Sequence, residues 1–163
     1  MTTNPTPIDF NRPGGFATFL ADVERCVAAA APGWTGTQQF VCAISDCYAF
    51  IRLQDLRHPV RFLRQAAGDP PMQFGTDGFN PTIVDDKNPA RHYTAFVFVG
   101  FWLPVILAVL VLWLWEILGF LRYGFRWSAN DIRCGYVGIR HGRQVRRGGP
   151  GVLPALVRRD LAA

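Results

Sequence analysis

The sequence contains none of the patterns that identify the common catalytic or nucleotide-binding sites. It has no Ser-His-Asp arrangement, no phosphate-binding loop and no glycine fingerprint for a dinucleotide. The segment GRQVRRGGPG combines glycines with arginines, but it lacks the Lys-Ser/Thr pair and the preceding strand that a phosphate loop requires. No zinc-finger, KH or RNP pattern accompanies the basic residues, so nucleic acid is not an expected partner. No metal site is predicted, and no pattern in the sequence identifies another cofactor.

Cysteine is scarce, and no CxxC pair is present. The closest two of the four cysteines are five residues apart, which is about 140° around a helix, so one helix would not bring them together. We therefore expect Cys26, Cys42, Cys47 and Cys134 to be buried thiols in a reducing compartment rather than disulfide or metal partners. The first fifteen residues have neither a basic n-region nor an apolar h-region, so no secretory signal peptide is expected.

Charged residues make up only 18% of the chain, and their distribution is uneven. Residues 1–91 carry a net charge of −1, whereas residues 122–163 carry nine arginines and two aspartates, a net charge of +7. A basic segment directly after an apolar one is typical of a protein that meets a membrane surface. The lipid bilayer is therefore the first expected partner.

A long apolar run, residues 95–121, contains Glu116 as its only charged residue. About 20 apolar residues cover the ~30 Å hydrocarbon layer of a bilayer, and no polar stripe runs along this segment. Pro104 is expected to kink the helix without reversing it, because a reversal within lipid would leave many backbone groups unsatisfied. The run therefore predicts one transmembrane helix, residues 92–121, with His92 and Glu116 more than about 30 Å apart.

Aromatic and basic residues lie at both ends of this run, as membrane-interface residues do. The predicted interface residues are Tyr93, Trp102, Trp113, Trp115, Arg122, Tyr123 and Arg126. The arginine excess after the run predicts a cytoplasmic C-terminus in the inner (plasma) membrane.

Helical spacing of apolar residues before the run predicts an all-α protein. Phe16, Leu20, Val23 and Val27 form one stripe, and Phe40, Ile44, Cys47 and Ile51 form a second. The predicted organisation is a flexible arm (1–15), a small helical domain (16–68), a linker (69–91), the transmembrane helix (92–121) and an irregular basic C-terminal tail (122–163). This organisation favours a single-span bacterial membrane protein that acts as an accessory subunit or anchor, with membrane-protein partner subunits, rather than an enzyme.

One spacing pattern goes beyond hydropathy. NPARHY is followed, 24 residues after His92, by Glu116, and then by SANDIRCGYVGIRHG. Residues 86–142 resemble an uncharacterised all-α domain family found at the C-terminal ends of secreted bacterial polymorphic toxins. In that family Arg-His opens a helix, a His-Glu pair closes the next, and Met-Asp leads into a paired-Asn, Val-Gly segment. The resemblance implies a polar constellation of Arg91, His92, Glu116 and Asp131, with Val137 and Gly138 as backbone markers.

The sequence departs from that pattern at three positions. Trp115 stands where the family has the His of the His-Glu pair, and Cys134 and Gly135 stand where it has the paired Asn. These departures weaken the chemistry of the motif more than its spacing.

A second interpretation follows if the chain turns near GFWLP. Two helices of about 12 residues would then form a hairpin, each too short to span a bilayer, and His92 would meet Glu116. An imidazole beside a carboxylate can act as a general base or bind a metal, with Asp131 as a third member. The alternative function is therefore a compact all-α effector or toxin-like domain, a candidate hydrolase using His92, Glu116 and Asp131. The two interpretations differ in the distance between His92 and Glu116. A continuous helix separates them by more than about 30 Å, whereas a hairpin brings their side chains into contact.

Overall fold

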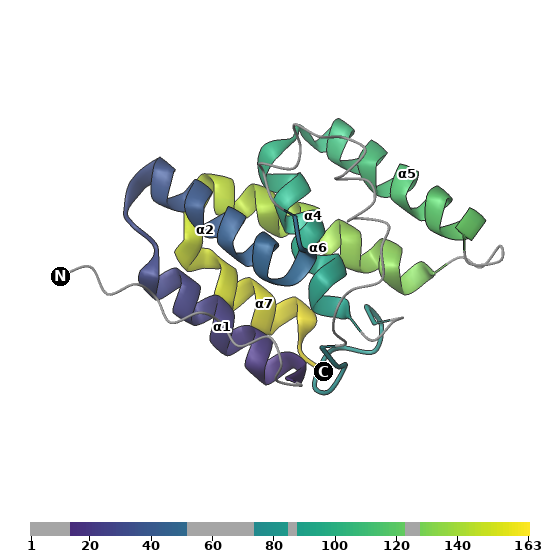
Figure 1. Ribbon diagram of the computed structural model, residues 1–163, viewed down its shortest axis with the longest axis horizontal. Helices are drawn as coiled ribbons and strands as arrows, with labels where there is room; N and C mark the ends of the chain where they lie inside the picture. The colour runs from purple at the N-terminus through teal and green to yellow at the C-terminus, as the bar shows by residue number, and fades with distance from the viewer. Residues whose placement is uncertain (1–13, 52–73, 85–87, 123–127) are drawn as a thin grey trace.

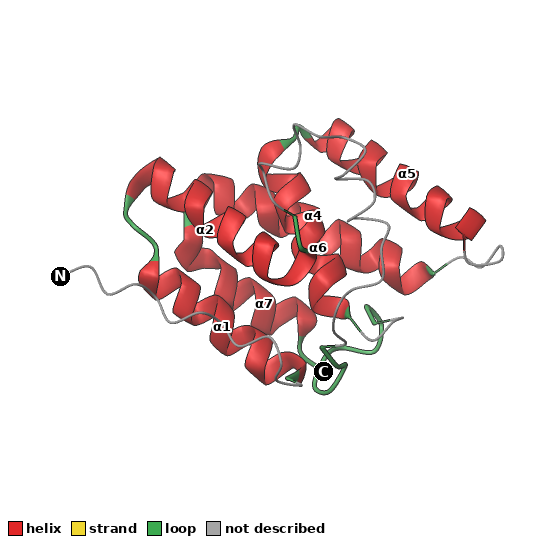
Figure 2. Cartoon of the chain, in the orientation of Figure 1, coloured by secondary structure: helices red, strands yellow, loops and turns green. Residues whose placement is uncertain are grey.

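The computed structural model describes residues 14–51, 74–84, 88–122 and 128–163, and the elements within these ranges are helices (Figures 1 and 2). They are α1 (Gly15–Ala29), α2 (Gly33–Ala49), α4 (Pro89–Trp102), α5 (Val105–Arg122), α6 (Ala129–Gly148), the short 3₁₀ helix η2 (Pro150–Val152) and α7 (Leu153–Leu161). No strand occurs in the described part of the chain, where a lone bridge joins Phe79 to Ala162.

The first two helices lie where the apolar spacing indicates. Phe19 and Val23 of α1 are fully buried, as are Val41 and Ile44 of α2 to within 1%. Pro32, in extended conformation, separates the two helices because it lacks the backbone N–H that would continue α1.

The apolar run does not form one helix. α4 ends at Trp102, Leu103 adopts an extended conformation, and α5 begins at Val105. The cause is Pro104, which cannot donate to the carbonyl of Gly100 and disfavours helical geometry in Leu103 before it. The chain reverses there, and α4 and α5 form a hairpin (Figure 1). The prediction that Pro104 would only kink the helix is wrong.

The transmembrane helix predicted for residues 92–121 is therefore wrong as well. Among the helices of the described residues, none is long and apolar enough to cross a bilayer. α4 is instead the central helix of the fold: Tyr93, Val97 and Phe101 are fully buried, and the helix packs against α2 and α6.

Residues 128–163 are ordered helices and not the irregular tail expected from the sequence. Ser128 caps α6 by accepting a hydrogen bond from the backbone N–H of Asp131 at 2.9 Å. Glycines let α6 approach α4 closely: a Cβ at Gly142 would lie 2.1 Å from the carbonyl oxygen of Val97, and one at Gly100 would lie 2.3 Å from that of Ile139. The arginines of α6 and α7 occupy the outer faces, while Leu153, Val157 and Leu161 fill the core.

The predicted membrane-interface residues do not form two belts. Tyr93 is fully buried and Trp102 is half-buried, whereas Trp113 and Trp115 are exposed on α5. Arg122 is the last residue of α5, and Tyr123 and Arg126 lie outside the described residues.

The chain end is tied to the segment before α4. The N–H of Asn80 donates to Leu161 at 2.8 Å, and the N–H of Ala163 donates to Gly78 at 3.0 Å. Phe74, Phe79 and Ile83 of this segment belong to the main core. Residues 74–84 therefore contribute to the packing that holds α4 and α7 in place.

Candidate functional site

The hairpin brings together two residues singled out from the sequence. His92 lies twelve residues before Pro104 and Glu116 lies twelve residues after it, so a reversal at the proline places them at the same level. The distance from His92 Nε2 to Glu116 Oε1 is 3.8 Å. Their side chains are only 10% and 8% exposed. The prediction of a separation above about 30 Å is wrong, because it depended on a continuous helix.

The environment of His92 keeps its imidazole neutral at neutral pH. Burial lowers the pKa of His92 to about 4; a hydrogen bond to the backbone of Asp131 opposes this shift, and the positive charge of Arg91 reinforces it. Nε2 is buried and has no hydrogen-bond partner among the described residues. A buried, unpartnered ring nitrogen facing a carboxylate can accept a proton from a third group that enters between them.

Asp131 reaches this pair through its backbone. It occupies the first turn of α6, where its backbone N–H donates a hydrogen bond to the side-chain oxygen of Ser128. The start of α6 is fixed in turn by Asn130, whose side-chain amide donates to the carbonyls of Val84 at 2.9 Å and Pro81 at 3.2 Å. The structure thus brings His92, Glu116 and the backbone of Asp131 together at the junction of α4, α5 and α6.

A metal site has no support in the described part of the chain, where no group of three or more His, Cys, Asp or Glu side chains is arranged to hold a metal ion. The four cysteines are free. Burial raises the pKa of the Cys47 thiol to about 12, with smaller contributions of the same sign from Cys26 and nearby carboxylates. A thiol in this state is a poor nucleophile.

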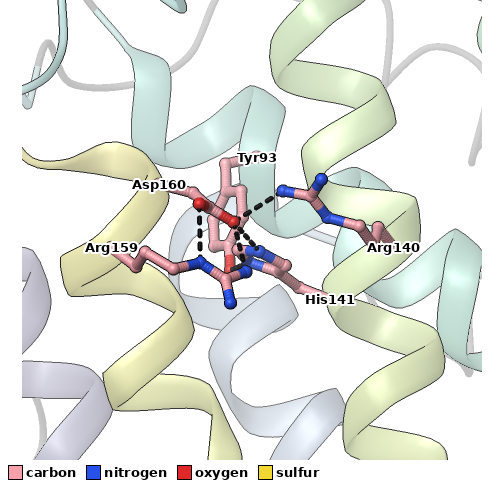
Figure 3. Close-up of polar contacts among 5 residues, drawn as sticks. All are labelled: Tyr93, Arg140, His141, Arg159 and Asp160. Atoms are coloured by element: carbon pink, nitrogen blue, oxygen red, sulfur yellow. Dashed lines mark hydrogen bonds and ion pairs between the residues drawn. The ribbon is translucent and has the colours of Figure 1, made fainter.

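A second buried polar cluster was not predicted from the sequence (Figure 3). The Tyr93 hydroxyl lies 2.7 Å from Nδ1 of His141, and Nε2 of His141 lies 2.8 Å from Oδ2 of Asp160. Arg140 and Arg159 both donate to the same carboxylate, at 2.6 Å and 2.8 Å. Tyr93 and His141 are fully buried. The cluster joins α4, α6 and α7.

The protonation states of this cluster follow from its geometry. Burial lowers the pKa of His141 to about 4, against the opposing effect of Asp160. Hydrogen bonding to Arg159, helped by His141, holds the pKa of Asp160 well below its usual range. With a neutral ring, one arrangement satisfies both nitrogens: the Tyr93 hydroxyl donates to Nδ1, and Nε2–H donates to Asp160.

This second cluster adjoins the first along α4. Tyr93 is the neighbour of His92 on α4, so the hydrogen bond to His141 fixes the rotation and height of the turn that carries His92. Only a weak signal for this cluster is present in the sequence. His141 and Asp160 lie in the segment predicted to be an irregular basic tail, although the helical spacing of Leu153, Leu156 and Val157 indicates a buried face.

No family model matches this chain, and no curated protein or solved structure matches it either. The resemblance of residues 86–142 to the toxin-associated domain family therefore stays a prediction that depends on its motif alone.

Proposed function

We propose that the protein is a compact all-α effector-type domain in which His92 and Glu116 form the general acid–base pair of a hydrolase. The observation that carries this proposal is the 3.8 Å approach of Nε2 of His92 to Oε1 of Glu116, between residues from two different helices. It is supported by the resemblance over residues 86–142, which names the same two residues.

The chemistry assigned to the pair is the transfer of one proton from water to the imidazole and then to the leaving group. His92 is neutral at neutral pH, so Nε2 has a lone pair available to accept a proton from an attacking water. The water O–H bond breaks, the oxygen forms a bond to the substrate, and the proton resides on the imidazole. Glu116 stabilises the imidazolium that results, and the hydrogen bond to the backbone of Asp131 keeps the ring oriented. The bond between the substrate and its leaving group breaks, and the imidazolium returns the proton to the leaving group, which completes the cycle.

Access to the pair depends on α5. The pair is nearly enclosed, and the residues of α5 that the structure describes as buried, Ala108, Leu112 and Glu116, form one stripe along the helix. A small displacement of this helix admits a substrate group to Nε2 without disturbing the α4–α6 packing.

The test uses the full chain expressed in bacterial cells from an inducible promoter. We expect expression to slow growth, and His92→Ala and Glu116→Gln each to restore growth at unchanged protein level and helicity. Glu24→Gln is the matched control, because it makes the same chemical change at an exposed carboxylate on α1. Growth inhibition that persists in both site variants would reject the assigned roles.

The other expected function, an accessory subunit or anchor, keeps one supporting observation. α5 presents a broad apolar face to solvent, which favours attachment of the domain to something apolar. The predicted cytoplasmic C-terminus depended on the transmembrane helix and has no remaining basis in the described residues.

A further inference from the structure

The outer face of α5 is apolar along its whole length. Its most exposed aliphatic side chains are 48–73% exposed: Ile106, Leu107, Leu110, Leu114, Leu118 and Leu121. At roughly 100 Å² for a half-exposed aliphatic side chain, these six reach the upper end of the ~300–600 Å² of the largest apolar patch on a typical monomer. The one acidic residue of α5, Glu116, points inward. This face therefore marks a binding surface and not ordinary surface variation.

The arrangement of side chains around α5 indicates which kind of partner this surface binds. Leu114 lies at the centre of the exposed arc, and its sequence neighbours Trp113 and Trp115 lie about 100° to either side. Both tryptophans are partly exposed, at 40% and 37%. An aliphatic ridge between two lateral tryptophans matches a helix lying flat in a bilayer interface, with aliphatic side chains in the acyl region and indoles at the headgroup level.

One exposed basic residue, Arg133, lies on α6 close to the edge of the apolar face. Tyr136 of α6 accepts a hydrogen bond from Trp113 Nε1 at 3.1 Å, which places it at the edge of the apolar face. Arg133 is exposed one turn earlier on the same helix. The chain as a whole has a formal net charge of +5. This charge complements anionic lipid headgroups.

A second copy of the chain fits this face less well. Packing of one helix against one helix covers a stripe along each helix, whereas the exposed arc of α5 extends over about 200° from one tryptophan to the other. A planar lipid surface covers such an arc in full.

We propose that the domain binds the surface of an anionic lipid bilayer through α5, which lies in the interface and does not cross it. This proposal is argued from a different face of α5 than the hydrolase proposal, because the lipid-facing ridge and the His92–Glu116 pair are on opposite sides of the helix.

The test is flotation of the full purified chain with phosphatidylcholine vesicles, with and without phosphatidylglycerol. The wild-type protein floats, more completely with the anionic lipid. Leu110→Gln/Leu114→Gln lowers the partition coefficient at least about tenfold while helicity is retained, because both residues are 59% exposed. Trp34→Gln is the control, because Trp34 is a tryptophan of α2 that is 49% exposed and whose ring stacks on Phe101 of α4 instead of lying on α5; its helicity is checked in the same way.

Brominated lipids measure how deeply the tryptophans of α5 lie in the bilayer. Bromine near the headgroups quenches the tryptophan fluorescence more than bromine at the acyl-chain ends, and the difference disappears in Trp113→Phe/Trp115→Phe. Stronger quenching by deep bromines contradicts an interfacial helix. Failure of the wild-type protein to float with either vesicle overturns the proposal, as does a stable dimer in solution that the Leu110/Leu114 variant converts to monomer.

Discussion

Lowering the pH from about 7.5 to about 5 should destabilise the protein by about 4 kcal/mol, because two buried histidines take up protons when it unfolds. Burial lowers the folded-state pKa of both His92 and His141 to about 4, compared with 6.5 for an unperturbed histidine. The unfolded state therefore binds more protons throughout the interval between these values. The stabilising contribution is complete above the unfolded pKa and is lost as the pH falls towards the folded pKa.

The magnitude follows from the size of the shift. One pKa unit corresponds to 1.36 kcal/mol, and pH ~5 lies about 1.5 units below the unfolded value, so each histidine contributes about 2 kcal/mol of the loss. Asp160 acts with the same sign, but only below its ordinary pKa of 3.8, because its folded-state pKa is lower still. It does not affect this interval.

Urea unfolding followed by circular dichroism at the two pH values measures the loss. His92→Gln and His141→Gln should each reduce the difference between the two pH values by about half, whatever their effect on absolute stability. An NMR titration in which both imidazoles change charge near pH 6.5 would refute the reasoning, because it would mean that neither ring is desolvated in the folded protein.

Two further predictions concern packing and the buried cluster. Gly142→Ala should lower the free energy of unfolding by about 1–3 kcal/mol, because the new Cβ would lie 2.1 Å from the carbonyl oxygen of Val97. Gly119→Ala, where the Cβ meets nothing within 4 Å, should instead stabilise the protein by up to ~1 kcal/mol. Equal effects of the two substitutions in urea unfolding would contradict the close contact between α4 and α6. Tyr93→Phe should cost about 1–3 kcal/mol, because it leaves the buried acceptor Nδ1 of His141 unsatisfied, whereas the same change at exposed Tyr136 should cost less than ~0.5 kcal/mol in thermal unfolding.

The helices in which apolar residues recur at helical spacing among polar ones could be predicted from the sequence. In α1 the stripe of Phe16, Leu20 and Val23 predicts the helix, but its buried face also includes Phe19 and Asp22, which lie outside that stripe. The apolar run gave no such information, because side chains that face lipid and side chains that fill a core have the same composition. The outcome at Pro104 depends on whether the backbone groups freed by a turn can meet water, and this depends on the surroundings of the helix.

The candidate site could be predicted in part. The symmetric placement of His92 and Glu116 about Pro104 is visible in the sequence, and the hairpin alternative predicts their contact. The contribution of Asp131 through its backbone could not be read from residue types. Nor could the Tyr93–His141–Asp160 cluster, whose members are 48 and 19 residues apart and meet because glycines allow α4 and α6 to pack closely.

The central claim is that the chain reverses at Pro104, and one distance tests it most directly. Spin labels at Arg91→Cys and Ile117→Cys, in a chain whose four native cysteines are replaced by serine or alanine, lie thirteen residues before and after the proline. In the hairpin, with helix axes about 8–10 Å apart, double electron–electron resonance should give a label separation below about 25 Å. A separation near 39 Å, the length of 26 residues of continuous helix, would contradict the hairpin and with it the His92–Glu116 site.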